Sequence, residues 1–597
     1  MTAYNPPLDD IRFVLSGLTG LDTLRLLPAF KTLGGDQIDD LLDHAARFAT
    51  ERLAPLYRTG DTVGCRLESG TVTTPPGFSD AWTRFREAGW CAATADPAHG
   101  GQGLPRLVGG ALAEIWNGAN MPFALCAALT ESAATLLAEH GDAVQKAVYL
   151  PKLVSGEWTG AMAMTEPQAG SDVGALTCRA EPDGDRYRLF GQKIYISWGE
   201  HDLTDNIIHM VLARLPDAPA GSRGISLFLA PKFLPDESGR PAAGNDLQCL
   251  SLEKKMGLHA SPTCVMEYGG GDGAIAWRVG EEGGGLAAMF TMMNAARIAI
   301  GIEGIGLAER AFQQARAYAR ERLQGRSQSN AGSGPSPIIH HSDVRRMLLL
   351  SKARIEAMRA LAAEAGLAAD LSRHHPDPAT RREQSARLGI LTPLVKAWCT
   401  DGAVEIASTA LQVHGGAGYI EETGIAQILR DARITPIYEG TNGIQALDLV
   451  RRKLATGDGQ AIDGLIEEIH RFDSQLTGSE RPEIAEIRMH LATARDALTR
   501  TTRFVHNCLA ADSNIADAAA TSYLDLLATV LGGYHLARAA LRAGQCLDTN
   551  AEGQDFHRAK LATAHLYAAA ALPLAVAREQ EIRDTAALIA GYPSALI

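Results

Sequence analysis

A chain of 597 residues is longer than a single hydrophobic core organises, so several domains or layers are expected. Hydrophobic residues make up 46% and charged residues 21%, an ordinary globular balance that argues against extensive disorder. The formal net charge of −13 disfavours a nucleic-acid-binding protein, which needs surplus cations against phosphate, although one local basic patch can still bind an anionic substrate.

Cysteine spacing and the length of apolar runs argue against a disulfide-bonded, metal-binding, exported or membrane-spanning protein. The nine cysteines are dispersed without a CxxC pair, which predicts reduced core thiols, no disulfide framework and no metal site. The start, MTAYNPPLDDIRF, has no basic segment followed by an apolar run, so no export signal is expected. Charged or polar residues interrupt the apolar helical runs before about 18 residues, which predicts no membrane span and a cytoplasmic protein.

The first predicted domain is helical and covers residues 36–157, after an N-terminal extension at 1–35. Near its start, Ile38, Leu42 and Ala45 recur at helical spacing, with acidic and basic residues on the opposite face.

The pattern changes to short alternating segments at residues 158–280. Examples are 185–199, 205–215 and 224–231, which are separated by Gly, Pro and Asp. Alternation with this punctuation predicts a small β domain.

Helical periodicity returns at residues 281–458, and a last block at 459–597 is rich in Ala and Leu with few helix breakers. This block predicts an additional helical bundle. The whole chain is therefore expected to be mainly α with a central β domain. Because strands and helices do not alternate, a Rossmann sheet is disfavoured.

Three stretches carry the residue types of a cofactor site. The first, AMAMTEPQAGSDVG (161–174), is a Gly-rich polar turn that exposes backbone N–H groups and hydroxyls, although an ordinary connecting loop has the same composition. In the second, GQKIYISWG (191–199), Tyr195 and Trp198 are either core aromatics or residues that flank a flat cofactor.

The third stretch runs from QVHGGAGY to IYEGTNGIQ (412–445). Its glycines let backbone approach a diphosphate, or simply turn the chain. Glu439 follows the apolar Ile437, and a carboxylate in apolar surroundings has a raised pKa, which suits a general base near neutrality. The alternative is an acid that faces the dipole at a helix N-terminus.

Together, TEPQAGSDV, GQKIYIS and the distant HGGAGY…RDARI…IYEGT resemble the acyl-CoA dehydrogenase family over about residues 36–453. The resemblance implies an α-helical domain, a β-barrel-like domain and a four-helix bundle at 281–458, with FAD bound between them. The cofactor-binding residues that it implies are Met162, Met164, Thr165, Ser171, Tyr195, Ser197, Arg322, Gln324, Gln412, Gly416 and Thr441. The substrate-binding residues that it implies are Ser171, Asn294, Arg297, Tyr438 and Gly440.

The resemblance also implies that Glu439 is the catalytic base, which removes the α-proton of an acyl-CoA thioester to give the trans-2-enoyl-CoA. Some branches of the family place the base near position 296, but this chain has Ala296 there, which cannot accept a proton.

The extra C-terminal block and HSDVRRML (341–348) resemble the long bacterial branch of the family. That branch implies 3-methylmercaptopropionyl-CoA or a medium- or long-chain acyl-CoA as substrate, an electron-transferring flavoprotein as acceptor, and a homodimer.

Two alternatives stay open. An acyl-CoA oxidase has a similar length and passes electrons to oxygen, but the C-terminal PSALI is no SKL-type peroxisomal address. A DNA-associated alkylation-response flavoprotein of the same fold would need a basic C-terminal domain, whereas residues 460–597 carry mixed charge.

Overall fold

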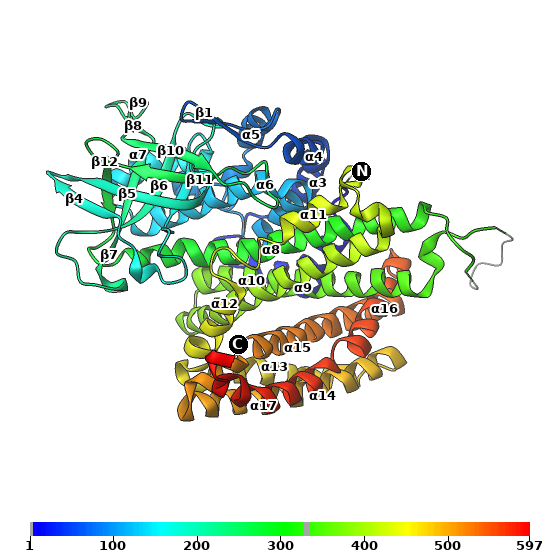
Figure 1. Ribbon diagram of the computed structural model, residues 1–597. Coiled ribbons are helices and arrows are strands. Elements are labelled where there is room, and N and C mark those ends of the chain that lie inside the picture. Colours follow the sequence, from blue (N-terminus) through cyan, green and yellow to red (C-terminus); the bar gives the residue numbers. More distant parts are fainter. Residues whose placement is uncertain (1–3, 328–333, 597) are drawn as a thin grey trace. The chain divides into compact units, whose positions relative to one another are not determined.

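The computed structural model describes residues 4–327 and 334–596, which form two compact units. Unit 1 comprises Met1–Ala46, Pro105–Glu114 and Ile300–Ile597, and unit 2 comprises Arg47–Leu104 and Ile115–Ala299. The predicted fold class, mainly α with a central β domain, is visible in Figure 1. No feature of the structure tests the predicted domain boundaries, which stay predictions.

Unit 2 contains the central sheet, whose strands follow the order β10-β11-β5-β12-β7-β6-β3, while β4 pairs with β5 and β6. The strands are β3 (Thr159–Ala163), β4 (Arg179–Asp183), β5 (Arg186–Ser197), β6 (Ile207–Arg214), β7 (Ile225–Pro231), β10 (Leu247–Leu252), β11 (Thr263–Tyr268) and β12 (Ala274–Val279). All seven residues of β7 are buried, so the alternation predicted for 224–231 does not hold: a strand buried on both faces has a nearly continuous apolar sequence. β3 lies at the end of the strand path, so the chain enters the sheet at an edge.

Two small ribbons accompany this sheet. β8 (Phe233–Pro235) pairs with β9 (Pro241–Gly244), and β1 (Arg66–Glu68) pairs with β2 (Thr71–Thr73). The β1–β2 ribbon lies within the predicted helical domain at 36–157 and was not expected from the sequence. Three strand residues are too few to show a period in the sequence.

The helices that lie wholly or partly in unit 2 are α3 (Gly35–Phe48), α4 (Ala54–Val63), α5 (Phe78–Glu87), α6 (Arg106–His140), α7 (Ala143–Ser155) and α8 (Gly285–Glu321). Asn120, with φ of −160°, breaks the helical path of α6 two residues before Pro122. Proline inside a helix removes a backbone hydrogen bond, which accounts for the kink.

The rest of unit 1 is helical: α13, α15 and α16 pack against α9 or α10, and α14 and α17 pack against α15 (Figure 1). Its helices are α1 (Leu8–Arg12), α2 (Leu21–Arg25), α9 (Ser342–His374), α10 (Pro378–His414), α11 (Ile425–Ala432), α12 (Asn442–Asp448), α13 (Gln460–Thr477), α14 (Pro482–Ala511), α15 (Ser513–Asp548), α16 (Gln554–Ala570) and α17 (Leu574–Gly591). α15 packs against α14, α16, α17 and α9, so it joins the extra C-terminal block to the preceding bundle.

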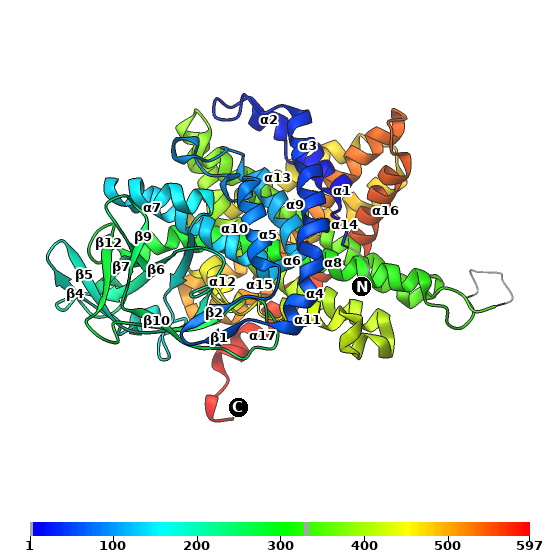
Figure 2. The same cartoon turned by 90° about the horizontal axis from the view of Figure 1, so that it is seen from above.

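The N-terminal extension packs into the same unit. The ring of Phe13 contacts the ring of Phe556 edge to face at 5.6 Å, and Figure 2 shows α1 beside α16. Val14 and Leu18 share a buried cluster with residues of α9 and α15. The first helices, α9 and the C-terminal block therefore share one core.

Four helical stretches are long and apolar enough to cross a membrane by length and composition. They are Arg106–His140, Gly285–Glu321, Ser513–Asp548 and Gln554–Gly591. These stretches still contain polar or charged interruptions, for example Asn117 and Asn120 in the first and Arg297 and Glu303 in the second, so the absence of a membrane span stays a prediction. In the same order, 72%, 56%, 67% and 44% of the most apolar 18-residue segment of each stretch is buried inside the protein. Protein packing therefore covers much of this apolar surface.

Candidate functional site

The turn between α11 and α12 places Glu439. Glu439 has φ of +56° and Gly440 has φ of +85°, so two consecutive residues adopt left-handed backbone. Thr441 ends the turn as the N-cap of α12, and its Oγ1 accepts a hydrogen bond from the N–H of Ile444 at 3.2 Å. A non-glycine residue in this conformation costs about 1–3 kcal/mol and is held there by its surroundings, a feature that is frequent at functional sites.

Glu439 and Tyr438 are both half-buried, while Ile437 is 48% exposed. Atom Oε2 of the Glu439 carboxylate is shielded from solvent. The hydroxyl of Tyr438 donates a hydrogen bond to Oε2 of Glu303, a residue of α8 that is 1% exposed. Two carboxylates are thus close to one tyrosine, and only Glu439 is partly accessible.

The pKa values in this cluster are strongly shifted. Burial raises the pKa of Glu303 to about 8, and the negative charge of Glu439 adds to this effect. The hydrogen bond from Tyr438 and the positive charge of Lys396 act in the opposite direction but do not cancel it. Burial, together with the neighbouring carboxylates, also raises the pKa of Tyr438 well above its ordinary value. At neutral pH the cluster therefore holds Glu303 and Tyr438 in their neutral forms.

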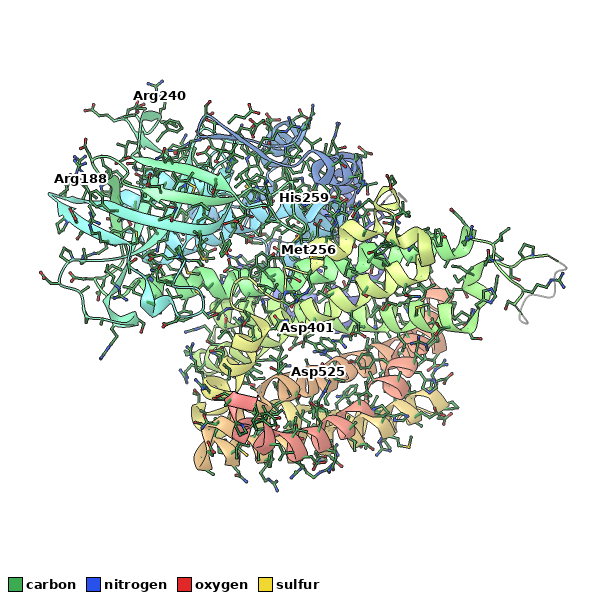
Figure 3. The ribbon with its side chains drawn as sticks, viewed as in Figure 1. Arg188, Arg240, Met256, His259, Asp401 and Asp525 are labelled. Atoms are coloured by element: carbon green, nitrogen blue, oxygen red, sulfur yellow. The ribbon has the colours of Figure 1, made fainter. Side chains whose placement is uncertain are left out.

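A second network fixes the residue that follows this turn. Lys396, which is fully buried on α10, donates from Nζ to Oδ1 of Asn442 at 2.8 Å. The amide of Asn442 donates to the carbonyl of Ala397 at 3.1 Å, to Oγ1 of Thr400 at 3.0 Å and to Oδ1 of Asp401 at 2.8 Å. Figure 3 marks Asp401 in this part of unit 1. α10 therefore anchors the start of α12, and with it one end of the Glu439 turn.

In unit 2, the loop after β3 carries Thr165 and Ser171. Ser171 is exposed and Thr165 is half-buried. Met162 is 8% exposed within β3, and the carbonyl of Met164 accepts a hydrogen bond from Nζ of Lys193 at 3.0 Å. The loop thus presents a hydroxyl residue at the surface while its first turn is tied to β5.

A buried ion pair holds this loop. The carboxylate of Glu166 accepts from Nζ of Lys193 at 2.8 Å, and the two side chains are 2% and 0% exposed. It also accepts from the backbone N–H groups of Thr177 at 2.7 Å and Cys178 at 2.9 Å. Although burial opposes ionisation, these positive and hydrogen-bonding partners lower the pKa of Glu166 to about 2.

The two aromatic residues of the second motif have different environments. Tyr195 is 60% exposed, whereas Trp198 is fully buried and packs edge to face against the ring of His201 at 5.4 Å. Trp198 is therefore a core residue, and the alternative that it flanks a cofactor is wrong. Ser197 is half-buried and pairs with Thr263 of β11.

The predicted substrate residues on α8 contact one another. Arg297 is 6% exposed, and its Nη1 donates to Oδ1 of Asn294 at 3.2 Å. The guanidinium lies 5.9 Å from the ring centre of Phe290. Arg297 is thus a nearly buried cation, whereas Asn294 is exposed.

The remaining predicted residues of unit 1 are exposed. Arg322 donates to Oε1 of Gln324 at 3.4 Å, just beyond the end of α8. Gln412 and Gly416 are exposed as well, and a Cβ atom added at Gly416 would meet nothing within 4 Å. Their backbone is open to a ligand at close range.

Sequence reasoning missed Glu303, Lys396, Asn442 and the pair Glu166–Lys193. Glu166 and Lys193 lie inside the first and second motifs, but a sequence motif does not show that the two side chains meet. A signal for Glu303 does exist, because it is a single carboxylate in the apolar run IAIGIEGIGLA (298–308), and buried carboxylates are rare unless they are paired or functional.

Family models match most of this chain. The chain matches the family model "Acyl-CoA dehydrogenase, N-terminal domain" at residues 36–157, its "middle domain" at 161–269, its "C-terminal domain" at 283–454, and "Acetyl-CoA dehydrogenase C-terminal like" at 465–593.

Several relatives are similar along nearly their whole length. A 3-methylmercaptopropionyl-CoA dehydrogenase of Ruegeria pomeroyi is 44% identical over 98% of both chains. Two solved structures share the fold: ACDH-11 of Caenorhabditis elegans in complex with C11-CoA, and an acyl-CoA dehydrogenase of Bacillus anthracis complexed with FAD. The first has a TM-score of 0.78 and 22% identity, covering 99% of this chain and 96% of its own. The second has a TM-score of 0.73 and 20% identity, covering 96% and 91%.

Proposed function

The chain belongs to the acyl-CoA dehydrogenase family, and we propose that Glu439 is the base with which it removes the α-proton of its acyl-CoA substrate. The protein is an FAD-dependent oxidoreductase that dehydrogenates acyl-CoA thioesters. The observation that carries the proposal is the half-buried carboxylate of Glu439, held on a left-handed turn with one oxygen shielded from solvent.

The residues present fit FAD. Tyr195 offers an exposed aromatic ring, and a Cβ atom added at Gly170, Gly415 or Gly416 would meet nothing within 4 Å, so backbone at these positions is open to a phosphate. When bound, FAD supplies the oxidised ring that accepts a hydride. The residues that would hold it are Met162, Met164, Thr165, Ser171, Tyr195, Ser197, Arg322, Gln324, Gln412, Gly416 and Thr441.

In the proposed mechanism, the carboxylate of Glu439 accepts the α-proton while the β-hydrogen leaves with its electron pair. The backbone N–H of Glu439 would donate a hydrogen bond to the thioester carbonyl, where negative charge develops. Substrate binding would also remove water from around the carboxylate, and desolvation raises the pKa of a carboxylate and makes it a stronger base.

The test is the variant Glu439→Gln, which keeps the shape of the side chain but cannot accept a proton. The holoenzyme should bind FAD and acyl-CoA, yet the flavin should bleach about 100- to 10,000-fold more slowly under anaerobic conditions, the scale of a positioned general base. Stopped-flow absorbance measures this rate. Bleaching at the parental rate would exclude Glu439 as the base.

For the substrate, we propose 3-methylmercaptopropionyl-CoA, because the relative that is 44% identical over 98% of both chains carries that name. The alternative is a medium- or long-chain acyl-CoA, since one structural neighbour binds C11-CoA. A panel should pair the thioether substrate with pentanoyl-CoA, which replaces the sulfur atom by a methylene group, and include longer acyl chains. A kcat/KM that rises steadily with chain length would contradict the thioether proposal.

The electron acceptor that we propose is an electron-transferring flavoprotein. Substrate-reduced enzyme should pass its electrons to that protein faster than to oxygen. Hydrogen peroxide released in proportion to turnover under air would instead support the oxidase alternative. A cytoplasmic location stays a prediction from the sequence.

A further inference from the structure

Glu303 is a buried carboxylic acid next to the proposed base. It projects from α8, is 1% exposed, and its Oε2 accepts a hydrogen bond from the hydroxyl of Tyr438, the residue before Glu439. Its Oε1 is also buried and has no hydrogen-bond partner among the residues that the structure describes. An ionised carboxylate needs several donors to compensate for lost hydration, so a site with one donor favours the neutral acid.

The charged and hydrogen-bonding groups that act on Glu303 come from two other elements. The turn after α11 contributes Tyr438 and Glu439, and α10 contributes Lys396, whose Nζ donates to Asn442. Asp431 acts on Tyr438 but is not among the groups that act on Glu303. Burial and Glu439 favour the neutral acid, and their combined effect exceeds that of Lys396 and the tyrosine hydroxyl, so the pKa of Glu303 rises to about 8.

On the premise that Glu439 is the base, we propose that Glu303 is a positioning residue that acts in its protonated form: it holds Tyr438, and through Tyr438 the turn that carries Glu439. Its proton has a second effect. While Glu303 is neutral, Glu439 is the single negative charge of the carboxylate pair, and loss of the proton places a second negative charge beside the base and the developing enolate.

Two variants separate these effects. Glu303→Gln is neutral at every pH and keeps an oxygen that accepts the hydrogen bond from Tyr438. Glu303→Leu removes that acceptor. At pH 7 we expect the first variant to reduce its flavin within about threefold of the parental rate, and the second to be roughly 10- to 100-fold slower, because small misplacements of reacting groups cost up to about 100-fold. Equal, large losses in both variants would overturn the proposal, since they would mean that the anion is needed.

The pH profile of flavin reduction tests the role of the proton. The parental rate should change around pH 8, and Glu303→Gln should lack that ionisation. Glu309→Gln is the matched control: Glu309 is a buried carboxylate on the same helix, but it pairs with Arg359, so this variant should keep the parental ionisation. A parental profile in Glu303→Gln would overturn the proposal.

A measurement that does not depend on turnover completes the test. The folded protein keeps the Glu303 proton up to about pH 8, whereas an unfolded glutamate releases it near 4.5, so folding of the parent becomes less favourable as pH rises through this window. The difference in Tm, Glu303→Gln minus parent, should therefore increase between pH 4.5 and 8 and stay level above pH 8. A constant Tm difference would contradict the proposal. If Glu439→Gln stays active while this Tm trend appears, the assignment of the base fails and the protonated state of Glu303 stands.

Discussion

At the scale of one residue, Glu439 combines a side chain that the chemistry needs with a backbone that glycine would favour. Its φ of +56° places Cβ close to backbone oxygen, and Gly440, at +85°, continues the left-handed path without that cost. Glycine at position 439 would relieve the strain but would remove the carboxylate. The turn therefore keeps a locally unfavourable conformation at the residue proposed for proton transfer.

This strain can be measured by comparing Glu439→Gly with Glu439→Ala. Both variants lack the carboxylate, but only alanine keeps a Cβ atom at positive φ, so the glycine variant should be more stable by about 1 kcal/mol. Denaturant unfolding of the two proteins gives the difference in free energy of unfolding. Equal stabilities would show that the turn relaxes when the carboxylate is removed, and that the carboxylate's own contacts maintain the left-handed conformation.

At the scale of elements, the sequence predicted the cofactor segments but not how they are held. TEPQAGSDV and GQKIYIS were expected as separate loop and strand motifs, whereas the structure joins them through Glu166 and Lys193. That contact depends on how β5 lies against the loop, which no local pattern specifies. Tyr195 and Trp198 have φ of +60° and +55°, which breaks strict strand alternation, so period-two reasoning could not tell the exposed ring from the buried one.

Glu303 shows that, for helices too, a local sequence pattern does not specify tertiary contacts. Periodicity predicted a return to helix from residue 281, and α8 spans Gly285–Glu321. Which residue of another segment faces Glu303 is a matter of tertiary packing. The proposed base, in contrast, could be named from the sequence, because the resemblance to the family rests on the contiguous motif IYEGT that contains Glu439.

The Glu166–Lys193 pair should control the stability of the loop that carries Thr165 and Ser171. Glu166→Gln leaves Lys193 as a buried charge without its ion-pair partner, which should lower the free energy of unfolding by about 3–5 kcal/mol. The double variant Glu166→Gln with Lys193→Met removes both charges and should recover part of the loss. No recovery in the double variant would show that the hydrogen bonds to Thr177 and Cys178 matter more than the ion pair.

The same pair gives a stability signature at low pH. Because the pKa of Glu166 is lowered from 4.5 to about 2 in the folded protein, its ionised form stabilises the fold above pH 4.5, and this contribution is lost as pH falls through about 2. Between these values the Tm of the parent should fall more steeply than that of the double variant. Parallel curves would contradict the contribution of Glu166.

At the scale of the whole molecule, the extra C-terminal helices are part of unit 1 and not a separate appendage. Lys560 of α16 forms ion pairs with Asp10 of α1 and with Glu356 of α9, and its ammonium group lies 5.5 Å from the ring centre of Phe13. Residues from the start, middle and end of the chain thus meet around one buried lysine. The long N- and C-terminal segments are therefore expected to fold together.

The homodimer that the family resemblance implies has a suitable surface in unit 1. α8 is joined to the segment after α10 by stacking of Tyr318 on His414, with ring centres 4.4 Å apart. Beyond these contacts, Leu323, Tyr419 and Ile420 are 51%, 84% and 51% exposed. Exposed apolar and aromatic side chains on adjoining segments are typical of a protein–protein interface.

We therefore expect the parent to be a dimer of twice the 63.5 kDa chain mass, and Tyr419→Asp combined with Ile420→Asp to be a monomer, because buried unpaired charges disfavour association. Light scattering coupled to size exclusion measures both masses. Tyr592→Asp is the matched control, since Tyr592 is also an exposed aromatic residue, at 56%, but lies beyond α17 at the far end of the chain. If the control dissociates and the double variant stays dimeric, the interface lies at the C-terminal helices and not near the end of α8.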